Sequence, residues 1–392
     1  MSEACAGDEL YFDANASEPL RPEAHQAALE GLALTGNPSS VHSQGRQARQ
    51  ALDKARRQVA ELFQRPEDAC IFTSGATEAN AAAIYGFREL ARLEGRSDHV
   101  LVGATEHQAV RQAAPDADLV PVGPDGRHDL AALENLLVGE NGSPPALLCV
   151  MAANNETGVV SDLPAIAALC VRCQVPLHVD AAQAAGRMKL PLAALENASL
   201  ALSGHKAGGL AGAGALLLPA AMASSPFPPF MKGGGQEQGR RGGTPPLVAI
   251  MAMAAALEAA SQQDWQKVRT LRQTMAKAMR RVGAIIQGPA QGGEGTMLPN
   301  TLSVTVPGLS AQAQLMALDL AGICVSSGSA CSSGKVGSSP VLAAMGLGPA
   351  ARQTLRISLP WNVQPKQVER FMEVWHAMVA RHQSQQAPRC QP

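Results

Sequence analysis

Residues 70–93 read CIFTSGATEANAAAIYGFRELARL, a short apolar run, a turn and then a helix-like segment. Further short apolar runs alternate with helical patterns along the chain, at 99–103, 117–122, 146–151, 175–180 and 199–203. Strands that alternate with helices in this way predict a mainly parallel sheet with helices on both of its faces. The sequence therefore predicts an α/β fold, in which ligands bind beyond the carboxyl ends of the strands.

The pattern changes after the glycine-rich loop KGGGQEQGRRGGTPP at 232–246. A long helix-like stretch runs from Leu247 to about Val282. Strand candidates follow at 301–306, 322–327 and 354–359, with a helix expected over 310–321. We expect a large domain over residues 18–250 and a smaller α+β domain formed by residues 1–17 and 251–392, since a chain of this length normally forms two domains.

The charge of the chain is balanced, with 32 Lys and Arg residues against 33 Asp and Glu residues and a net charge of −1. No long basic run could follow a phosphate backbone, so nucleic acid is not expected as a direct partner. The acidic start, MSEACAGDEL, lacks the order of a secretion signal. No apolar run approaches the roughly 20 residues that span a bilayer. We expect a cytoplasmic protein without a membrane partner.

Eight cysteines are scattered over the chain, unlike the dense pattern of a disulfide scaffold: Cys5, Cys70, Cys149, Cys170, Cys173, Cys324, Cys331 and Cys390. In a reducing compartment they are expected to be free thiols. Cys170 and Cys173 form a C-x-x-C pair, but they lie in the helix-like LPAIAALCVRC without a second pair at zinc spacing. We interpret this pair as structural and expect no metal site.

The turn TSGATE at 73–78 follows a strand candidate and precedes a helix. Backbone amides at such a helix start, together with the hydroxyls of Ser74 and Thr77, could bind an anion such as phosphate. An ordinary helix cap by Ser or Thr would produce much the same sequence. Taken alone, the motif does not separate these two interpretations.

Two later strand candidates also end in polar residues. HVDAAQ places Asp180 where its carboxylate can hold a proton on a ligand nitrogen, and LSGHKAGG places Lys206 where its amine can form a Schiff base with an aldehyde. Lys206 considered alone could equally be a solvated loop lysine. A phosphate site, a carboxylate and a lysine at three strand ends are together the parts that hold pyridoxal phosphate.

The motifs also resemble those of a known family, the cysteine desulfurases of the NifS and IscS type, in the class V aminotransferase group of fold type I pyridoxal-phosphate enzymes. The matching segments are GNPSSVHSQGR at 36–46, TSGATEAN at 73–80, EHQAV at 106–110, NNETGVV at 154–160, HVDAAQ at 178–183, SGHK at 203–206, GGGQEQGRRGGT at 233–244 and SSGSAC at 326–331. They cover nearly the whole chain in the family's order. The resemblance implies a seven-stranded, mainly parallel sheet in the large domain.

The resemblance assigns catalytic roles to Lys206, which would bind the cofactor covalently, and to His107, whose ring would stack over it. Asp180 would partner the pyridine nitrogen, and Gln183 would contact the phenolic oxygen. The remaining cofactor contacts that it implies are Ala76, Thr77, Asn155, Ser203, His205 and Thr244. For His107 and Asn155, the residues by themselves would favour loop capping or turn formation.

Arg356, in TLRISL, matches the arginine that the family uses for the substrate carboxylate, and Asn155 would lie close to the same substrate. A guanidinium can meet a carboxylate through two parallel hydrogen bonds, although a surface strand arginine in a salt bridge would look the same. Thr244 matches a residue that reaches the phosphate of the neighbouring subunit. The resemblance therefore implies a homodimer with shared active sites.

Cys331 lies in SSGSACSSG at 326–334, where serine and glycine offer a thiol nothing to pack against. It could be a chance surface cysteine. By resemblance it would take sulfur from L-cysteine as a persulfide, leaving L-alanine, and deliver the sulfur to an acceptor such as an iron–sulfur scaffold or a sulfur carrier for tRNA thiolation. A selenocysteine lyase, a class V aminotransferase and an inactive scaffold remain as alternatives.

Overall fold

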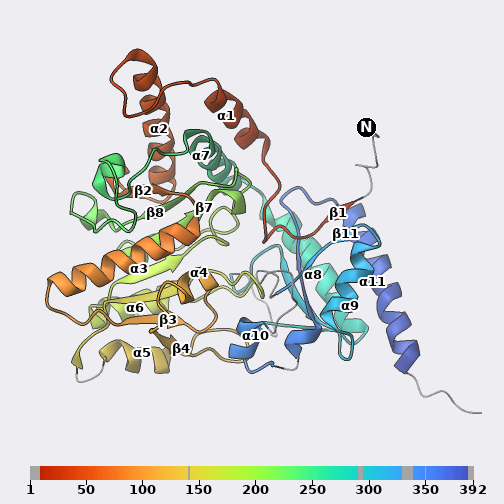
Figure 1. Cartoon of the computed structure of the whole chain (residues 1–392). Helices are drawn as coiled ribbons and strands as arrows, with labels where there is room; N and C mark the ends of the chain where they lie inside the picture. The colour runs from red at the N-terminus through yellow and green to blue at the C-terminus, as the bar shows by residue number, and fades with distance from the viewer. Residues whose placement is uncertain (1–8, 140–141, 290–294, 329–338, 349, 387–392) are drawn as a thin grey trace, which may run out of the picture.

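The computed structural model describes residues 9–139, 142–289, 295–328, 339–348 and 350–386 (Figure 1). Its main element is a seven-stranded sheet in the order β2-β8-β7-β6-β5-β3-β4. The strands are β2 (Cys70–Thr73), β3 (Val100–Gly103), β4 (Asp118–Val120), β5 (Leu147–Met151), β6 (Leu177–Asp180), β7 (Ala198–Ser203) and β8 (Gly214–Leu217). The five strands from β7 to β4 pair in parallel, while β8 pairs antiparallel with both β7 and β2. The predicted mainly parallel α/β sheet is confirmed.

Strand β8 is absent from the sequence-based prediction, because its segment AGAGALLL follows a glycine-rich turn that reads as a loop. The glycine at its start has a structural reason. A Cβ atom on Gly214 would lie 2.5 Å from the backbone of Gly75, so a side chain there would clash with the turn that follows β2. Gly214 thus lets β8 close against the TSGATE turn.

Helices cover both faces of this sheet (Figure 1). Buried side chains of α3 (Ala76–Leu93) and α4 (Gln108–Arg111) pack on one face, where Val100, Val102 and Ala201 point. Helices α2 (Ser43–Leu62), α5 (Leu130–Val138), α6 (Leu163–Cys173) and α7 (Leu247–Ser261) pack on the other. The alternation of side chains along each strand therefore divides the large core into two layers.

The expectation of one long helix from Leu247 to about Val282 is wrong. Helix α7 ends at Ser261, and a separate helix α8 spans Trp265–Arg281. The side chain of Asp264 caps α8 by accepting a hydrogen bond from the Gln266 amide over 3.0 Å. The chain therefore turns between two helical patterns, one apolar and one rich in charged residues, that look continuous in the sequence.

A second unit contains a four-stranded sheet in the order β12-β13-β10-β9. Its strands are β9 (Ile285–Ile286), β10 (Thr301–Thr305), β12 (Ser326–Ser327) and β13 (Thr354–Ser358). Helices α8, α9 (Ala311–Asp319) and α11 (Pro365–Gln386) form a core with it, and a short helix α10 (Pro340–Ala344) lies nearby. The segment expected as one strand at 322–327 is divided between β11 (Ile323–Cys324) and β12, which join different sheets.

The N-terminal segment completes this second unit. Strand β1 (Leu10–Tyr11) pairs in parallel with β11, and Phe12 is buried in the core of the second unit. The domain division after residue 250 stays a prediction. The buried side chains of α7 between Ile250 and Ala260 belong to the core of the large sheet, which favours a boundary between α7 and α8.

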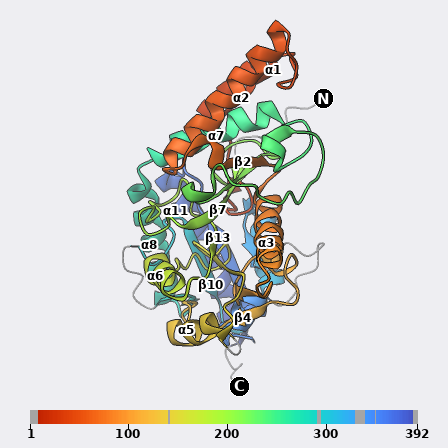
Figure 2. The same cartoon turned by 90° about the vertical axis from the view of Figure 1, so that its left-hand side faces the viewer.

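Helix α1 (Pro22–Leu32) contacts α7, and α1 and α2 together extend beyond the large sheet at one end of the molecule (Figure 2). Within the described ranges, no helix is both long enough and apolar enough to cross a membrane.

Candidate active site

A cavity of about 540 Å³ lies where the large sheet, the second unit and the N-terminal segment meet. Its lining includes nearly all the site residues expected from the sequence, namely Ala76, Thr77, His107, Asn155, Asp180, Gln183, Ser203, His205, Lys206 and Arg356. Asp180 and Ser203 are the last residues of β6 and β7. The cavity therefore lies at the carboxyl edge of the parallel strands, as the fold class predicts.

The start of α3 opens into this cavity. Gly75 precedes the helix and no side chain caps its first turn. Ser74 and Thr77 do not act as the cap that their sequence would allow. The exposed hydroxyl of Thr77, the hydroxyl of Ser203 and the ring of His205 line the same space. Uncapped amides and nearby hydroxyls form a site that could hold a phosphate group.

Asp180 is held by two donors. Its Oδ2 accepts from Asn80 Nδ2 over 2.8 Å and its Oδ1 accepts from the backbone amide of Ala182 over 2.9 Å. The residue is 7% exposed. Two donors hold this carboxylate in one orientation at the cavity.

Behind Asp180 a buried chain of hydrogen bonds runs through Asn80, His178 and Ser199. Because Asn80 donates its amide to Asp180, its Oδ1 faces His178 Nε2 at 2.8 Å, so this nitrogen carries the proton. His178 Nδ1 then accepts from the Ser199 hydroxyl over 2.8 Å. Burial lowers the pKa of His178 to about 3. His178 is therefore neutral at physiological pH and places no imidazolium charge behind Asp180.

His107 lines the cavity and also caps a helix. Its Nδ1 accepts a hydrogen bond from the Ala109 amide over 3.1 Å at the start of α4. Burial lowers the pKa of His107, and the charges of Lys206 and Arg356 add to this effect while Asp180 opposes it. His107 thus caps a helix, as the residue by itself would suggest, and also lines the cavity.

Lys206 follows β7 in a short 3-10 turn, Gly204–Lys206. Its Nζ donates to the backbone carbonyl oxygens of Asn15 and Ala16 over 2.6 and 2.8 Å. Both acceptors belong to the N-terminal segment, which also lines the cavity. The amine of Lys206 is therefore directed toward the N-terminal segment.

Arg356 lies on β13 and is 5% exposed. One Nη atom donates to Asp13 Oδ1 over 2.7 Å and the other donates to the carbonyl of Asn155 over 3.3 Å. Its Nε has no hydrogen-bond partner among the described residues. A guanidinium with a buried N–H to spare, at the edge of a polar cavity, is suited to bind a carboxylate.

Glu156 flanks the segment that carries Cys331. Its Oε2 accepts from the Ser339 hydroxyl over 2.5 Å, and a Cβ on Gly328 would lie 2.2 Å from the same oxygen. Burial raises the pKa of Glu156 to about 7, although the Ser339 hydrogen bond and the charge of Arg356 act in the opposite direction. The carboxyl group therefore contacts the residues on both sides of that segment.

Two expected site residues are not among those that line the cavity. Thr244 is exposed. Cys331 lies outside the described residues, although Ser326, which precedes it in the same motif, lines the cavity.

Cys324 donates its thiol to Glu9 over 3.1 Å, and burial together with this carboxylate raises its pKa to about 11.

The C-x-x-C pair lies in the last turn of α6, and burial raises the pKa of Cys170 to about 12. A thiol of that kind is unreactive at neutral pH, which agrees with the structural interpretation. In the part of the chain that the structure describes, no three His, Cys, Asp or Glu side chains form a group that could hold a metal ion.

Several residues around the cavity were not expected from the sequence. They are Asp13, Asn15, Glu18, Asn80, His178 and Arg187. Three of them belong to the short polar stretch DANASE at 13–18, directly after an apolar strand. A polar run at the end of a strand could have indicated these three residues, because the same pattern indicated Asp180.

Comparisons with known proteins agree with this geometry. Residues 10–371 match the family described as Aminotransferase class-V. A cysteine desulfurase from Cereibacter sphaeroides is 37% identical over 379 residues, which cover 94% of this chain and 95% of the relative. An IscS-like cysteine desulfurase from Mycobacterium tuberculosis is 33% identical over 386 residues, which cover 95% of this chain and 96% of the relative. The structure of a NifS-like protein from Rickettsia africae aligns with a TM-score of 0.83 at 29% identity, covering 95% of this chain and 99% of that one.

Proposed function

The chain belongs to the class-V aminotransferase family and, within it, to the cysteine desulfurases of the NifS and IscS type, and from this membership we propose a role for each residue around its cavity. The protein is a pyridoxal-phosphate-dependent enzyme that converts L-cysteine to L-alanine and passes the sulfur to an acceptor. The residue roles, the homodimer and the nature of the acceptor are our proposals.

The cavity fits the cofactor in the chemistry of its groups. The uncapped start of α3, with Thr77, Ser203 and His205, would hold the phosphate. Asp180 would hold the proton of the ring nitrogen, because it is buried and already oriented by two donors. The carboxylate, the amine of Lys206 and the phosphate site line one cavity, and this observation carries the proposal.

When bound, pyridoxal phosphate supplies an aldehyde for amines and a protonated ring that draws electrons from the substrate's α-carbon. We propose that Lys206 binds this aldehyde at rest and moves the α-proton of the substrate during turnover. The carbonyls of Asn15 and Ala16 accept hydrogen bonds from its Nζ, so they hold the amine in one position at the cavity. Gln183 and His107 would contact the ring from the cavity wall.

Arg356 would bind the carboxylate of L-cysteine and so orient it, with Asn155 beside it. The Cys331 thiolate would then form an S–S bond with the substrate sulfur as the C–S bond breaks, leaving a persulfide on the enzyme. Ser326 lines the cavity in the same motif as Cys331, which supports this role. The acceptor that we propose is a protein, either an iron–sulfur scaffold or a sulfur carrier.

The experiment that tests the lysine is a comparison of Lys206→Ala with Lys189→Ala. Lys189 is an exposed lysine outside the cavity and serves as the matched control. We expect Lys206→Ala to abolish alanine release from L-cysteine while it retains some cofactor through the phosphate site, whereas Lys189→Ala behaves as the wild type. Repeated turnover by Lys206→Ala would refute the assignment.

A further inference from the structure

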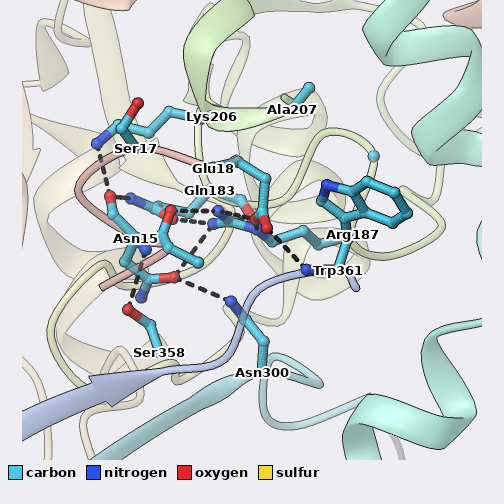
Figure 3. A network of polar contacts seen from close by, with 12 residues as sticks. Asn15, Ser17, Glu18, Gln183, Arg187, Lys206, Ala207, Asn300, Ser358 and Trp361 are labelled. Carbon is cyan, nitrogen blue, oxygen red and sulfur yellow. Dashed lines mark hydrogen bonds and ion pairs between the residues drawn. The ribbon is translucent and has the colours of Figure 1, made fainter. Parts of the chain in front are cut away.

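Next to the cavity lies a buried ion pair that the proposed chemistry does not use. Arg187 Nη2 and Glu18 Oε2 are 2.8 Å apart, and both side chains are 1% exposed (Figure 3). Burying two charges is costly unless further hydrogen bonds satisfy them, so such a pair adds little stability by itself. The rest of the Arg187 guanidinium shows what the pair holds in place.

Besides Glu18, the guanidinium contacts three residues, and one of its four hydrogen bonds to them runs from Nη1 to the Gln183 backbone carbonyl over 3.5 Å. Nη1 donates to Asn15 Oδ1 over 3.2 Å and also to Gln183 Oε1, and Nη2 donates to the Ala14 carbonyl over 2.9 Å. A planar fork of this kind fixes several acceptors in one geometry, which the single ammonium of a lysine cannot do. Arg187 therefore sets the relative position of Asn15 and Gln183, which come from separate parts of the chain.

Asn15 uses every polar atom that it has. Its amide Nδ2 donates to the Asn155 carbonyl and to Thr301 Oγ1, over 3.0 and 2.9 Å. Its backbone amide donates to Ser358 Oγ over 3.0 Å, and its Oδ1 also accepts from Asn300 over 3.2 Å. Asn15 is 1% exposed and joins the large sheet to the second unit (Figure 3).

The backbone carbonyl of Asn15 connects this network to the lysine. It accepts from Gln183 Nε2 over 3.0 Å and from Lys206 Nζ over 2.6 Å, and the next carbonyl, of Ala16, accepts from the same Nζ. Residues 13–21 form no helix and no extended strand, so their carbonyls depend on such tertiary contacts for position. A displaced carbonyl would move the lysine amine with it.

We propose that Arg187 is a positioning residue for Lys206: by holding Asn15 and Gln183 together, it places the two backbone carbonyls that receive the lysine amine. This inference rests on the proposed function, in which Lys206 binds the cofactor. Arg187 touches neither the substrate nor Lys206 in this role. It acts on kcat through the geometry of the lysine, and leaves substrate binding through Arg356 in place.

The test uses the holoenzyme and the variant Arg187→Lys, which keeps a positive charge beside Glu18 but loses the fork. Arg65→Lys is the matched control, since Arg65 is another buried arginine that donates to backbone carbonyls, those of Leu195 and Ala198, away from the cavity. Each protein is reduced with borohydride, and the peptide bearing the reduced cofactor is identified and quantified by mass spectrometry. Thermal unfolding and the values of kcat and KM for L-cysteine are measured in parallel.

For Arg187→Lys we expect kcat to fall by about ten- to a hundredfold, the effect of misplacing a reacting group by about 1 Å, with KM nearly unchanged. We also expect a loss of reduced cofactor on the Lys206 peptide relative to total bound cofactor. Arg65→Lys should match the wild type in both measurements, although it is less stable to heat.

A second variant, Asn15→Ala, leaves the ion pair intact and removes one of the contacts by which Arg187 holds the segment with the two carbonyls, while the contacts through Gln183 and the Ala14 carbonyl remain. It should show a smaller loss of the same kind, even if Arg187→Lys does not fold. If the variants label Lys206 as fully as the wild type and lower kcat no more than Arg65→Lys does, the positioning role is overturned. If the wild-type label lies on a peptide without Lys206, the proposed function itself fails.

Discussion

The guanidinium of Arg356 donates to the carboxylate of Asp13 over 2.7 Å, although 343 positions separate the two residues in the chain. Arg356 belongs to β13 and Asp13 to the N-terminal segment, and both line the cavity. The arginine that we propose for the substrate carboxylate thus already has a carboxylate partner. A bound substrate must share the guanidinium with Asp13 or displace it.

The first prediction concerns this competition. Replacing Asp13 by Asn removes a negative charge that faces Arg356, so KM for L-cysteine should fall. Arg356→Lys should raise KM about tenfold or more, because a paired hydrogen bond to a charged group contributes roughly 1.5–3 kcal/mol. Steady-state kinetics on both variants show whether Asp13 competes with the substrate for Arg356. An equal rise of KM in both would mean that Asp13 orients the arginine and does not compete for it.

The second prediction concerns the hydrogen-bond chain behind Asp180. Asn80→Leu removes the donor to the carboxylate and leaves His178 Nε2–H without its acceptor, so cofactor affinity should fall roughly ten- to a hundredfold. Ser199→Ala, at the far end of the same hydrogen-bond chain, is the control, and its cofactor affinity should fall much less. Absorbance titration of each apoprotein with pyridoxal phosphate measures the effect. Equal affinities in the two variants would contradict a role for Asn80 in holding Asp180.

The third prediction compares two cysteines. Cys331→Ala should bind L-cysteine yet release almost no alanine and form no persulfide, while it keeps appreciable cleavage of selenocysteine, whose carbon–selenium bond is weaker. Cys324→Ala should retain activity, because the raised pKa of Cys324 keeps it a thiol at neutral pH. Alanine release and persulfide labelling are the measurements. Near-normal desulfuration by Cys331→Ala would show that another group accepts the sulfur.

The fourth prediction concerns the shared site. Thr244 is exposed and does not line the cavity of its own chain. We expect a homodimer in which Thr244 reaches the partner's phosphate site, so Thr244→Asp should repel the cofactor phosphate across the interface. When Thr244→Asp and Lys206→Ala subunits exchange, the mixed dimer should regain one intact site and hence activity. If the mixed dimer gains no activity although mass spectrometry verifies the exchange, Thr244 does not contribute to the partner's site. Sedimentation of an active monomer would exclude the dimer.

The fifth prediction is a pH dependence of stability. Burial lowers the pKa of His128 to about 4, from an ordinary value of 6.5. At a pH between these two pKa values, His128 is protonated in the unfolded chain and neutral in the folded chain. The free energy of unfolding therefore falls as the pH decreases below 6.5. At pH 5 this one histidine should cost about 2 kcal/mol relative to neutral pH.

The variant His128→Leu tests that prediction. Neither ring nitrogen of His128 has a hydrogen-bond partner among the described residues, so an apolar side chain removes the titration without breaking a bond seen in the structure. Urea unfolding at pH 7.5 and pH 5 should show a smaller difference in unfolding free energy for the variant than for the wild type. An unchanged difference would mean that His128 does not titrate on unfolding in this range.

Much of the cavity could be predicted from the sequence, because a parallel sheet places the carboxyl ends of its strands at one edge. Asp180, Ser203 and Lys206 each end or follow an apolar run, so their meeting in space follows from the fold class alone. Strand β8 and the break between α7 and α8 could not be predicted, since glycine-rich and alanine-rich segments have weak periodicity. The roles of Cys331 and Thr244 stay predictions by resemblance.

Local patterns and motifs are enough to predict the α/β class, the family and the chemical groups that line the cavity. Which of these groups touch depends on how distant segments pack against one another. Asn15 meets Lys206 across 191 positions and Glu18 meets Arg187 across 169, and no local pattern encodes such pairs. A buried polar atom must find a partner within hydrogen-bond distance, and packing of the N-terminal segment between the two units decides which partner that is.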